Sequence, residues 1–520
     1  MSITDKLRSG SAIARSVLAP IERPDRLPRA ALAMAPWGSS AAALLAGAAA
    51  RYPDRVAVID DEGTITYRAL WRRTLAVAAA LQARGVGPGS RVGLLARNHH
   101  GFIEMVGAVA ATGADLVLLN TGFAGPQLAD VVAHEGVQVV VHDDEFASVV
   151  ASCGAALLVD EGALAEFGRA GRVGPPPSTG SIIILTSGTT GRPKGTARSG
   201  DVGGIEGVGA VLDRIPLRLG DTQVIAAPLF HAWGFSHLLL GLSRCTTNVV
   251  GRRFDAESTL QSLHEHRADV LVVVPVMLAR LVALSDESFR SSSTPQLRVI
   301  ASSGSAIGSA LVVHTLDRFG PVLYNLYGST EVAVASIARP ADLRAHPDTA
   351  GRPALGVRVE ILDSAGEPVP PGNVGRVFVG GSMRFDGYTN GDDKERVRGM
   401  VSSGDMGHVR DGLLFIEGRD DDMIVSGGEN VFPHEVEELL AAHPGVADVA
   451  VVGVPDDEFG QALMAFVVRA PRRRPTEQQL RRHVRDQLAR HKVPRSIRFV
   501  DELPRNTTGK VLRSRLLDQV

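Results

Sequence analysis

From about residue 51 the chain alternates short apolar runs with longer segments in which apolar residues recur at helical spacing. In the first half this pattern predicts strands at residues 56–60, 64–67, 91–95, 115–119 and 137–142, and helices at 68–84, 101–111 and 127–134. Such a succession is typical of βαβ units around a largely parallel sheet. The pattern therefore predicts an α/β fold.

A second alternating series follows a Pro- and Gly-rich patch at residues 171–180. It predicts strands at 224–227, 270–274, 297–301 and 322–326, and helices at 257–266, 276–284 and 308–318. The last two strands run directly into polar clusters at residues 302–305 and 327–331. Ligands of open α/β sheets bind beyond the carboxyl ends of the strands. We therefore expect the two clusters to form walls of one site.

After about residue 350 the pattern changes to Gly, Pro and short alternating strands, which predicts a small β-subdomain up to residue 418. A charged segment at 418–422 marks a boundary. Beyond it, the pattern predicts helices at 433–442 and after a cap at Thr476, and strands at 447–452 and 465–468. The predicted organisation is a leader segment at 1–50, a large N-terminal domain at 51–420 and a C-terminal α+β domain at 421–520.

Composition narrows the class of protein. A chain of 520 residues exceeds the size at which one core usually stops growing. The formal net charge of −2 gives no support for a nucleic-acid partner. Cys153 and Cys245 lie far apart, so a disulfide framework or zinc site is not expected. Their scarcity fits a reducing compartment, and we expect a cytoplasmic protein.

No apolar run reaches the roughly 18 residues of a membrane-spanning helix. Residues 1–30 are basic and contain Pro20, Pro24 and Pro28, but they have no continuous apolar region of the kind found in signal peptides. We expect a solvated leader, with peripheral membrane contact as the alternative.

One loop carries candidate chemistry by itself. The apolar run 182–185 leads into a Thr-, Ser- and Gly-rich loop that ends at Lys194. Glycines allow consecutive backbone N–H groups to turn inward around anionic oxygens. The loop does not match the Walker motif, because its glycines are too close together. It predicts a polyphosphate site, and an ordinary flexible turn is the alternative. The residues that would contact phosphate are Thr186, Ser187, Gly188, Thr189, Thr190, Gly191 and Lys194.

Seven segments in a fixed order extend this picture: 185–195, 228–231, 324–331, 403–405, 418–422, 426–430 and 504–510. In these segments the chain resembles the ANL superfamily of adenylate-forming enzymes, and in particular its acyl-CoA synthetase branch. The resemblance covers roughly residues 50–515. It implies that a carboxylate attacks the α-phosphate of Mg²⁺·ATP to give an acyl-adenylate and pyrophosphate, after which a thiol displaces AMP.

The resemblance also implies roles for individual residues. Glu331 and Thr186 would hold Mg²⁺, and Thr330 would contact the α-phosphate. Lys510 would bring positive charge to the transition state of adenylation. The residues implied in nucleotide binding are Gly304, Ser305 and Tyr327 for adenine, Asp405 for the ribose hydroxyls, and Arg419 for ribose or phosphate. A plain turn at 304–305 remains the alternative there.

Domain movement is implied as well. In the family the small domain swings about a hinge that corresponds here to Asp421, although an ordinary acidic loop would look the same. The second orientation would bring Ser426, Gly427 and Gly428 to the tunnel of coenzyme A. Because the sequence ends soon after Lys510, we expect free CoA rather than a fused carrier domain as acceptor.

The acid is predicted from the residues after Phe230. Amino-acid-activating relatives carry an Asp there, whereas this chain has none. His231, Trp233, Gly234 and Phe235 are expected to line the acyl pocket, with His231 also placed near the chemistry or, alternatively, in the core. The apolar run 235–242 favours a medium- or long-chain fatty acid. The alternatives are an aryl-CoA ligase, a fatty acyl-AMP ligase that loads a carrier protein, and a non-enzymatic nucleotide-binding protein on a degenerate fold.

Overall fold

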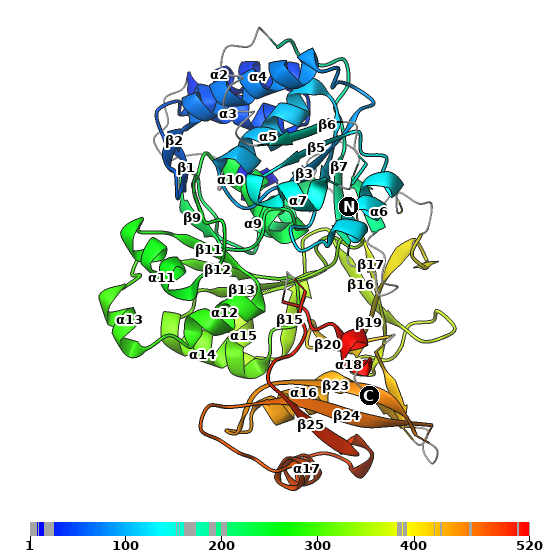
Figure 1. Ribbon diagram of the computed structural model, residues 1–520. Helices are drawn as coiled ribbons and strands as arrows, with labels where there is room; N and C mark the ends of the chain where they lie inside the picture. The colour runs from blue at the N-terminus through cyan, green and yellow to red at the C-terminus, as the bar shows by residue number, and fades with distance from the viewer. Residues whose placement is uncertain are drawn as a thin grey trace.

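The computed structural model describes residues 8, 10–14, 25–151, 153–154, 157–160, 173–186, 194–198, 205–381, 387, 393–420, 422–426, 429–456, 460–506 and 509–518. Two sheets build the large domain, and a third belongs to the C-terminal domain (Figure 1). The predicted α/β class is confirmed.

The first sheet has six strands in the order β6-β5-β3-β4-β7-β8. They are parallel except for β8, which runs antiparallel to β7. Alternate residues of β4 belong to different cores: Leu116 and Leu118 to one, Val117 to another. Helices therefore cover both faces, as parallel sheets require. The elements of this region are β3 (Arg91–Leu95), α5 (His100–Thr112), β4 (Asp115–Leu118), α6 (Gly125–His134), β5 (Val139–His142), α7 (Ala147–Val150), β6 (Leu157–Asp160), β7 (Ile182–Thr186), β8 (Lys194–Arg198) and α9 (Ile205–Leu212).

The second sheet has the order β16-β17-β19-β20-β15-β14-β13-β12-β11-β9-β10-β1-β2. Its strands from β13 to β1 are parallel. The elements are β1 (Val56–Asp60), β2 (Gly63–Thr66), α4 (Tyr67–Ala83), β9 (Thr222–Ile225), α10 (Ala232–Ser243), β10 (Thr247–Val250), α11 (Ala256–Glu265), β11 (Val270–Val273), α12 (Pro275–Val282), α13 (Asp286–Ser291), β12 (Val299–Ser302), α14 (Ser309–Phe319) and β13 (Leu323–Tyr327).

The predicted β-subdomain does not form a sheet of its own. Its strands continue the second sheet in antiparallel fashion, because β15 pairs with β14 on one side and with β20 on the other. The elements are β14 (Ser336–Ala338), α15 (Pro340–Ala345), β15 (Thr349–Pro353), β16 (Arg358–Leu362), β17 (Gly375–Gly380), β18 (Arg396–Val397), β19 (Met400–Arg410) and β20 (Leu413–Arg419).

Two helices lie at or near the predicted leader segment of residues 1–50. Helix α3 (Ala41–Arg51) begins at Ser40, whose side chain accepts a hydrogen bond from the N–H of Ala43. Ala42 and Leu45 are fully buried in the main core. Helix α2 (Arg26–Met34) packs against α3. Residues 41–51 are therefore part of the large domain's core.

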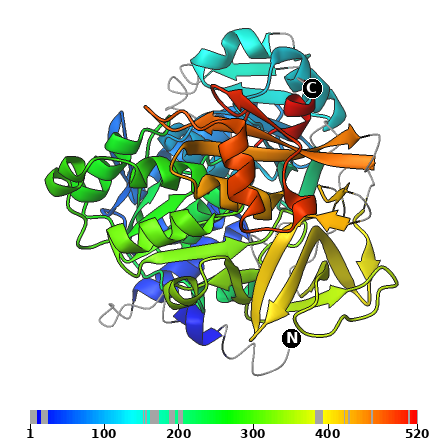
Figure 2. The ribbon, with the colours of Figure 1, turned by 90° about the horizontal axis from the view of Figure 1, so that it is seen from below.

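The C-terminal domain has a separate core that includes Val436, Leu440, Leu463 and Leu480. Figure 2 shows this orange and red domain lying across the large domain. Within the described part of the chain, no helix is both long and apolar enough to cross a membrane. The elements are β21 (Ile424–Ser426), β22 (Glu429–Val431), α16 (Pro433–Ala441), β23 (Val446–Asp456), β24 (Gly460–Arg469), α17 (Glu477–Arg485), β25 (Ser496–Val500) and α18 (Arg513–Leu517).

Candidate active site

A large cavity lies where the sheets of the large domain and the C-terminal domain meet. Its volume of about 1460 Å³ exceeds the roughly 300–1,000 Å³ of a pocket for one drug-sized ligand. The lining includes the segment after β13, residues of β19 and β20, helix α10, and the loop before α18. The space is thus sufficient for more than one substrate.

The carboxyl ends of β12 and β13 form one wall, as their polar clusters predict. The hydroxyl of Ser303 donates to the carbonyl of Leu326 at 2.8 Å and ties the two strand ends together. Gly304 and Ser305 follow and line the cavity, and Gly304 has a φ of 98°, which favours glycine. The structure therefore places Gly304 and Ser305, which are predicted to bind adenine, at the cavity wall.

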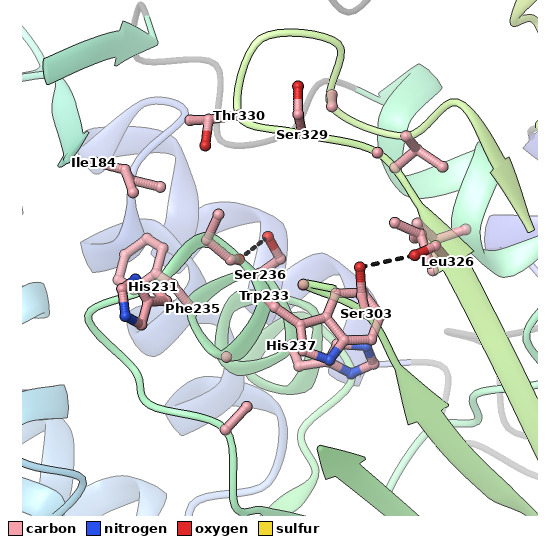
Figure 3. Close-up of a pocket in the computed structure, with 18 of the residues that line it drawn as sticks. Ile184, His231, Trp233, Phe235, Ser236, His237, Ser303, Leu326, Ser329 and Thr330 are labelled. Carbon is pink, nitrogen blue, oxygen red and sulfur yellow. Dashed lines mark hydrogen bonds between the residues drawn. The ribbon is translucent and has the colours of Figure 1, made fainter. Parts of the chain in front are cut away.

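The turn after β13 holds a carboxylate in the cavity. The Ser329 hydroxyl donates to Oε2 of Glu331 at 2.7 Å, and the N–H groups of Glu331 and Val332 donate to Ser329 Oγ at 3.2 and 3.3 Å. Figure 3 shows Ser329 and Thr330 across the pocket from His231 and Trp233. The turn thus faces the start of α10 across the pocket.

A second carboxylate of the cavity lining, that of Asp405, lies on β19. The hydroxyl of Tyr327 donates to Oδ2 of Asp405 at 2.5 Å, and Nη1 of Arg419 lies 3.5 Å from Oδ1. Burial raises the pKa of Asp405, and the hydrogen bond from Tyr327 and the charge of Arg419 oppose that rise. Burial also raises the pKa of the Tyr327 hydroxyl. Asp405 is an oriented acceptor, as a pair of sugar hydroxyls requires.

Lys510 reaches the same cavity from the C-terminal domain. The N–H of Lys510 donates to Oδ1 of Asn506 at 2.8 Å. Gly509 has a φ of 80°, and a Cβ there would lie 2.1 Å from Cγ1 of Val276 on α12. The loop therefore packs so closely on the large domain that only glycine fits.

The surroundings of Lys510 lower its pKa, although the side chain as a whole is exposed. The displacement of water by protein atoms is the main cause, and the charge of Arg419 adds to it. Asp405 and Asp422 act in the opposite direction. Lys510, Asp405 and Arg419 are thus within electrostatic range of one another.

The acyl side is built around the start of α10. His231 precedes the helix, and its ring centroid lies 4.4 Å from that of Phe230. Burial lowers the pKa of His231 to about 4, so the ring is neutral at pH 7. Nε1 of Trp233 donates to the carbonyl of Val273 at 3.0 Å, which fixes the indole. Gly234 and Phe235 also line the cavity, as the sequence predicts.

His237, one turn further along α10, was not among the predicted site residues. Its ring centroid lies 4.5 Å from that of Trp233, and within the described part of the chain neither ring nitrogen has a hydrogen-bond partner. Burial lowers its pKa to about 3, and the charge of Arg244 adds to the effect. Recognition of α10 as a helix would have identified this residue, because His237 lies four positions after Trp233.

Other predicted site residues lie at strand ends or outside the described part of the chain. Thr186 and Lys194 are backbone partners at the ends of β7 and β8, and Ser426 ends β21. Residues that lie outside the described part of the chain are Ser187, Gly188, Thr189, Thr190, Gly191, Asp421, Gly427 and Gly428.

The carboxylate of Glu331 suits Mg²⁺. Among the described residues there is no group of three or more His, Cys, Asp or Glu that could hold a metal. Mg²⁺ is commonly bound by one or two carboxylates together with substrate phosphates. A single carboxylate beside a nucleotide pocket fits that mode of binding.

One cavity on this two-domain α/β fold is lined by Asp405, Arg419 and Lys510 and also by the start of α10. This arrangement is the one expected of an adenylate-forming enzyme. The AMP-binding enzyme family model matches residues 45–389, and the model of the AMP-binding enzyme C-terminal domain matches residues 435–510. The chain belongs to the AMP-binding enzyme family.

Named relatives support the same class. The chain is 33% identical over 494 residues to the fatty acid–[acyl-carrier-protein] ligase ScoC of Streptomyces coeruleorubidus, covering 90% of this chain and 94% of the relative. It is 34% identical over 475 residues to a feruloyl-CoA synthase of Amycolatopsis sp, with 89% and 95% covered. The anthranilate CoA ligase AuaEII in complex with anthranoyl-AMP has a TM-score of 0.85 at 25% identity, with 92% and 97% covered. The chain is an AMP-forming acid–thiol ligase that works through an acyl-adenylate.

Proposed function

We propose that this ligase activates a medium- or long-chain fatty acid and transfers the acyl group to coenzyme A. The carboxylate attacks the α-phosphate of ATP, pyrophosphate leaves, and the thiol of CoA then displaces AMP. The observation that carries the proposal is the shared cavity, in which Asp405 and Lys510 accompany an apolar acyl side.

In the proposed mechanism the large domain orients the nucleotide. Asp405 accepts hydrogen bonds from the ribose hydroxyls, with its orientation fixed by Tyr327. Thr330 contacts the α-phosphate, and Thr186 and Lys194 lie at the ends of the phosphate loop. Mg²⁺, held by Glu331 and by phosphate oxygens, would neutralise charge on the phosphates.

Lys510 acts on the first step. Its ammonium bridges the carboxylate and the α-phosphate, so it stabilises negative charge that is greatest in the transition state. After adenylation the C-terminal domain rotates about Asp421 and brings Ser426, Gly427 and Gly428 to the thiol. A lid movement of this kind separates the two half-reactions in time.

The choice of acid rests on the acyl side. Helix α10 contains no Asp or Glu, so nothing on it pairs a buried substrate ammonium. The name of ScoC favours a fatty acid, whereas the names of the feruloyl and anthranilate ligases favour an aryl acid as the second candidate. ScoC also makes a carrier protein the alternative thiol donor.

A product assay tests the proposal. The enzyme is incubated with ATP, Mg²⁺ and either octanoate or palmitate, with and without CoA, and the products are identified by mass. We expect AMP and the acyl-CoA. An acyl-adenylate that accumulates and does not react with CoA would instead indicate the carrier-protein ligase. Turnover of cinnamates alone would indicate an aryl-CoA ligase.

A further inference from the structure

Helix α10 borders the cavity along its whole length. Both its first residue, Ala232, and its last, Ser243, line the cavity. Beyond the first turn, Ser236, Leu239 and Leu240 lie at spacings that place them on one face with Ser243. A helix of 12 residues at about 1.5 Å per residue is about 18 Å long. The acyl side is therefore deep.

Helix α3 borders the cavity in the same way. Its first and last residues, Ala41 and Arg51, line the cavity, and Leu44, Gly47 and Ala48 lie between them at helical spacing. Helices α3 and α10 pack against each other. Nη1 of Arg55, just after α3, donates to the carbonyl of Cys245, just after α10, at 3.3 Å. The C-terminal ends of the two helices therefore lie close together, and both helices line the same cavity.

The third wall is α2. Its lining residues Leu27, Ala30, Ala31 and Met34 follow the spacing i, i+3, i+4, i+7, so they share one face. A Cβ at Gly47 would lie 2.7 Å from both Cγ and Sδ of Met34. Met34 thus rests directly on Gly47, so α2 and α3 touch at this point of the cavity wall.

The lining of these faces is chemically uniform. From Leu27 to Met34 on α2 and from Leu44 to Ala48 on α3, the lining residues are Leu, Ala, Met and Gly. None of these lining residues is charged. An aryl acid would occupy only the start of the channel near Trp233. A long alkyl chain would replace water along its full length, and burying each methylene contributes roughly fourfold in affinity.

We infer that the channel between α2, α3 and α10 holds the alkyl tail of a long-chain acyl group, and that Gly47 with Met34 determines the chain length accepted. This inference rests on the proposed function and narrows its substrate class. Gly47 keeps the channel open, because any larger side chain must enter the channel or displace Met34. Met34 closes part of the channel, so a smaller residue there lengthens the accepted chain.

The test compares kcat/KM for palmitate and octanoate in the full-length enzyme. We expect the wild type to prefer palmitate, and Gly47→Leu to lower the palmitate-to-octanoate ratio at least tenfold, since two or more methylenes lose their contacts. Met34→Ala should raise the ratio. Leu32→Ala is the matched control, because Leu32 lies on α2 but is exposed and does not line the channel. A ratio that neither Gly47→Leu nor Met34→Ala changes would overturn the inference.

A binding measurement without ATP separates this inference from the proposed reaction. Palmitate should raise the melting temperature of the wild type and not that of Gly47→Leu, because a ligand stabilises only the state that binds it. If palmitate stabilises the wild type in this way but is not turned over, the channel stands and the proposed reaction fails. If palmitate neither binds nor reacts, the channel assignment is wrong even where octanoate is a substrate. If the Gly47→Leu protein does not fold, Met34→Ala alone tests the inference with the same measurement. In that case Met34→Ala must strengthen palmitate binding.

Discussion

The two ends of the cavity are built on different physical principles. At the nucleotide end, ionisable groups interact with one another. Tyr327 donates a hydrogen bond to Asp405, and Arg419 lies 3.5 Å from the same carboxylate. The charges of Asp405 and Arg419 both act on Lys510. At the acyl end the lining is mostly apolar, with Arg51 at the end of α3, and burial lowers the pKa of His231 to about 4 and that of His237 to about 3.

This difference separates chemistry from selectivity. The attack of a carboxylate on a phosphate requires oriented cations and hydrogen-bond acceptors. Their electrostatic interactions are strong only where water is displaced. Recognition of an alkyl chain requires space and surface, which helix faces provide. Substitutions at the nucleotide end should therefore change rates or ATP affinity for every acid, whereas those at the acyl end should change the ranking of acids.

The largest expected effect is at Lys510. Lys510→Ala should lower the rate of adenylation about 10²- to 10³-fold, the cost of removing one oriented electrostatic group from a transition state. Transfer to CoA from supplied acyl-adenylate should remain largely intact. ATP–pyrophosphate exchange measures the first step, and acyl-CoA formation from the adenylate measures the second.

Lys492→Ala is the control for this prediction. Lys492 belongs to the same domain but pairs with Glu435 at 2.5 Å, away from the loop of Lys510. It should leave both steps unchanged. Equal loss of both half-reactions in Lys510→Ala would refute the assigned role.

Asp405 should show the next largest effect. Asp405→Asn keeps the shape of the side chain but removes its charge, and hydrogen bonds to charged groups contribute roughly 1.5–3 kcal/mol. We expect the KM for ATP to rise about 10- to 100-fold at any acid. Asp411→Asn, at the exposed turn of the same β19–β20 hairpin, should leave the KM unchanged. An unchanged KM in Asp405→Asn would mean that the ribose binds elsewhere.

The sequence predicts the nucleotide end better than the acyl end. Strands β12 and β13 have ordinary apolar runs followed by polar clusters, and both were predicted within two residues of their observed ends. Helix α10 was missed, because its sequence AWGFSHLLLGLS is apolar on nearly every side and lacks a 3.6-residue alternation. Helix α3 was not predicted for the same reason, because its sequence AAALLAGAAAR is apolar on nearly every side.

The arrangement of the two domains could not be predicted from pattern at all. Glu438 lies on α16 and Ser309 begins α14, and their contact depends on how the domains lie against each other. Local periodicity places each residue on its helix but carries no information about that orientation.

Protonation of the acyl end should reduce stability in acid. An unfolded His has a pKa near 6.5, whereas His231 and His237 stay neutral in the folded protein down to about pH 4 and about pH 3. The unfolded state therefore binds more protons below pH 6.5, and the stability present above that pH is lost as the pH falls toward 4. From pH 7.5 to pH 5 each ring should cost about 2 kcal/mol.

Denaturant unfolding at a series of pH values measures this loss. His237→Leu, which keeps an apolar residue of similar size, should flatten the dependence of the unfolding free energy on pH between 6.5 and 4.5. His264→Leu is the control, because His264 is exposed on α11. A slope that His237→Leu does not change would show that His237 is protonated in the folded protein.

The smallest expected effect lies between the two domains. Both the N–H and the hydroxyl of Ser309 donate to Oε1 of Glu438, at 3.2 and 3.1 Å. Helix α14 has glycine, Gly308, at its cap position, so the carboxylate of the other domain serves as its cap. Glu438→Ala should lower the rate of adenylation about fivefold, since an interaction of about 1 kcal/mol helps to hold the orientation in which Lys510 enters the cavity.

The same substitution should leave transfer to CoA unchanged or faster, because that step needs the domain to leave this position. Glu502→Ala, at an exposed position of the same domain, should affect neither step. Equal slowing of both steps by Glu438→Ala would mean that the carboxylate supports the fold of α14 or α16 rather than the closed arrangement. A selective slowing of adenylation would instead show that the contact at α14, outside both ends of the cavity, helps to control the position of the C-terminal domain. Such control would change the rate of the chemistry at the nucleotide end without altering the acyl end.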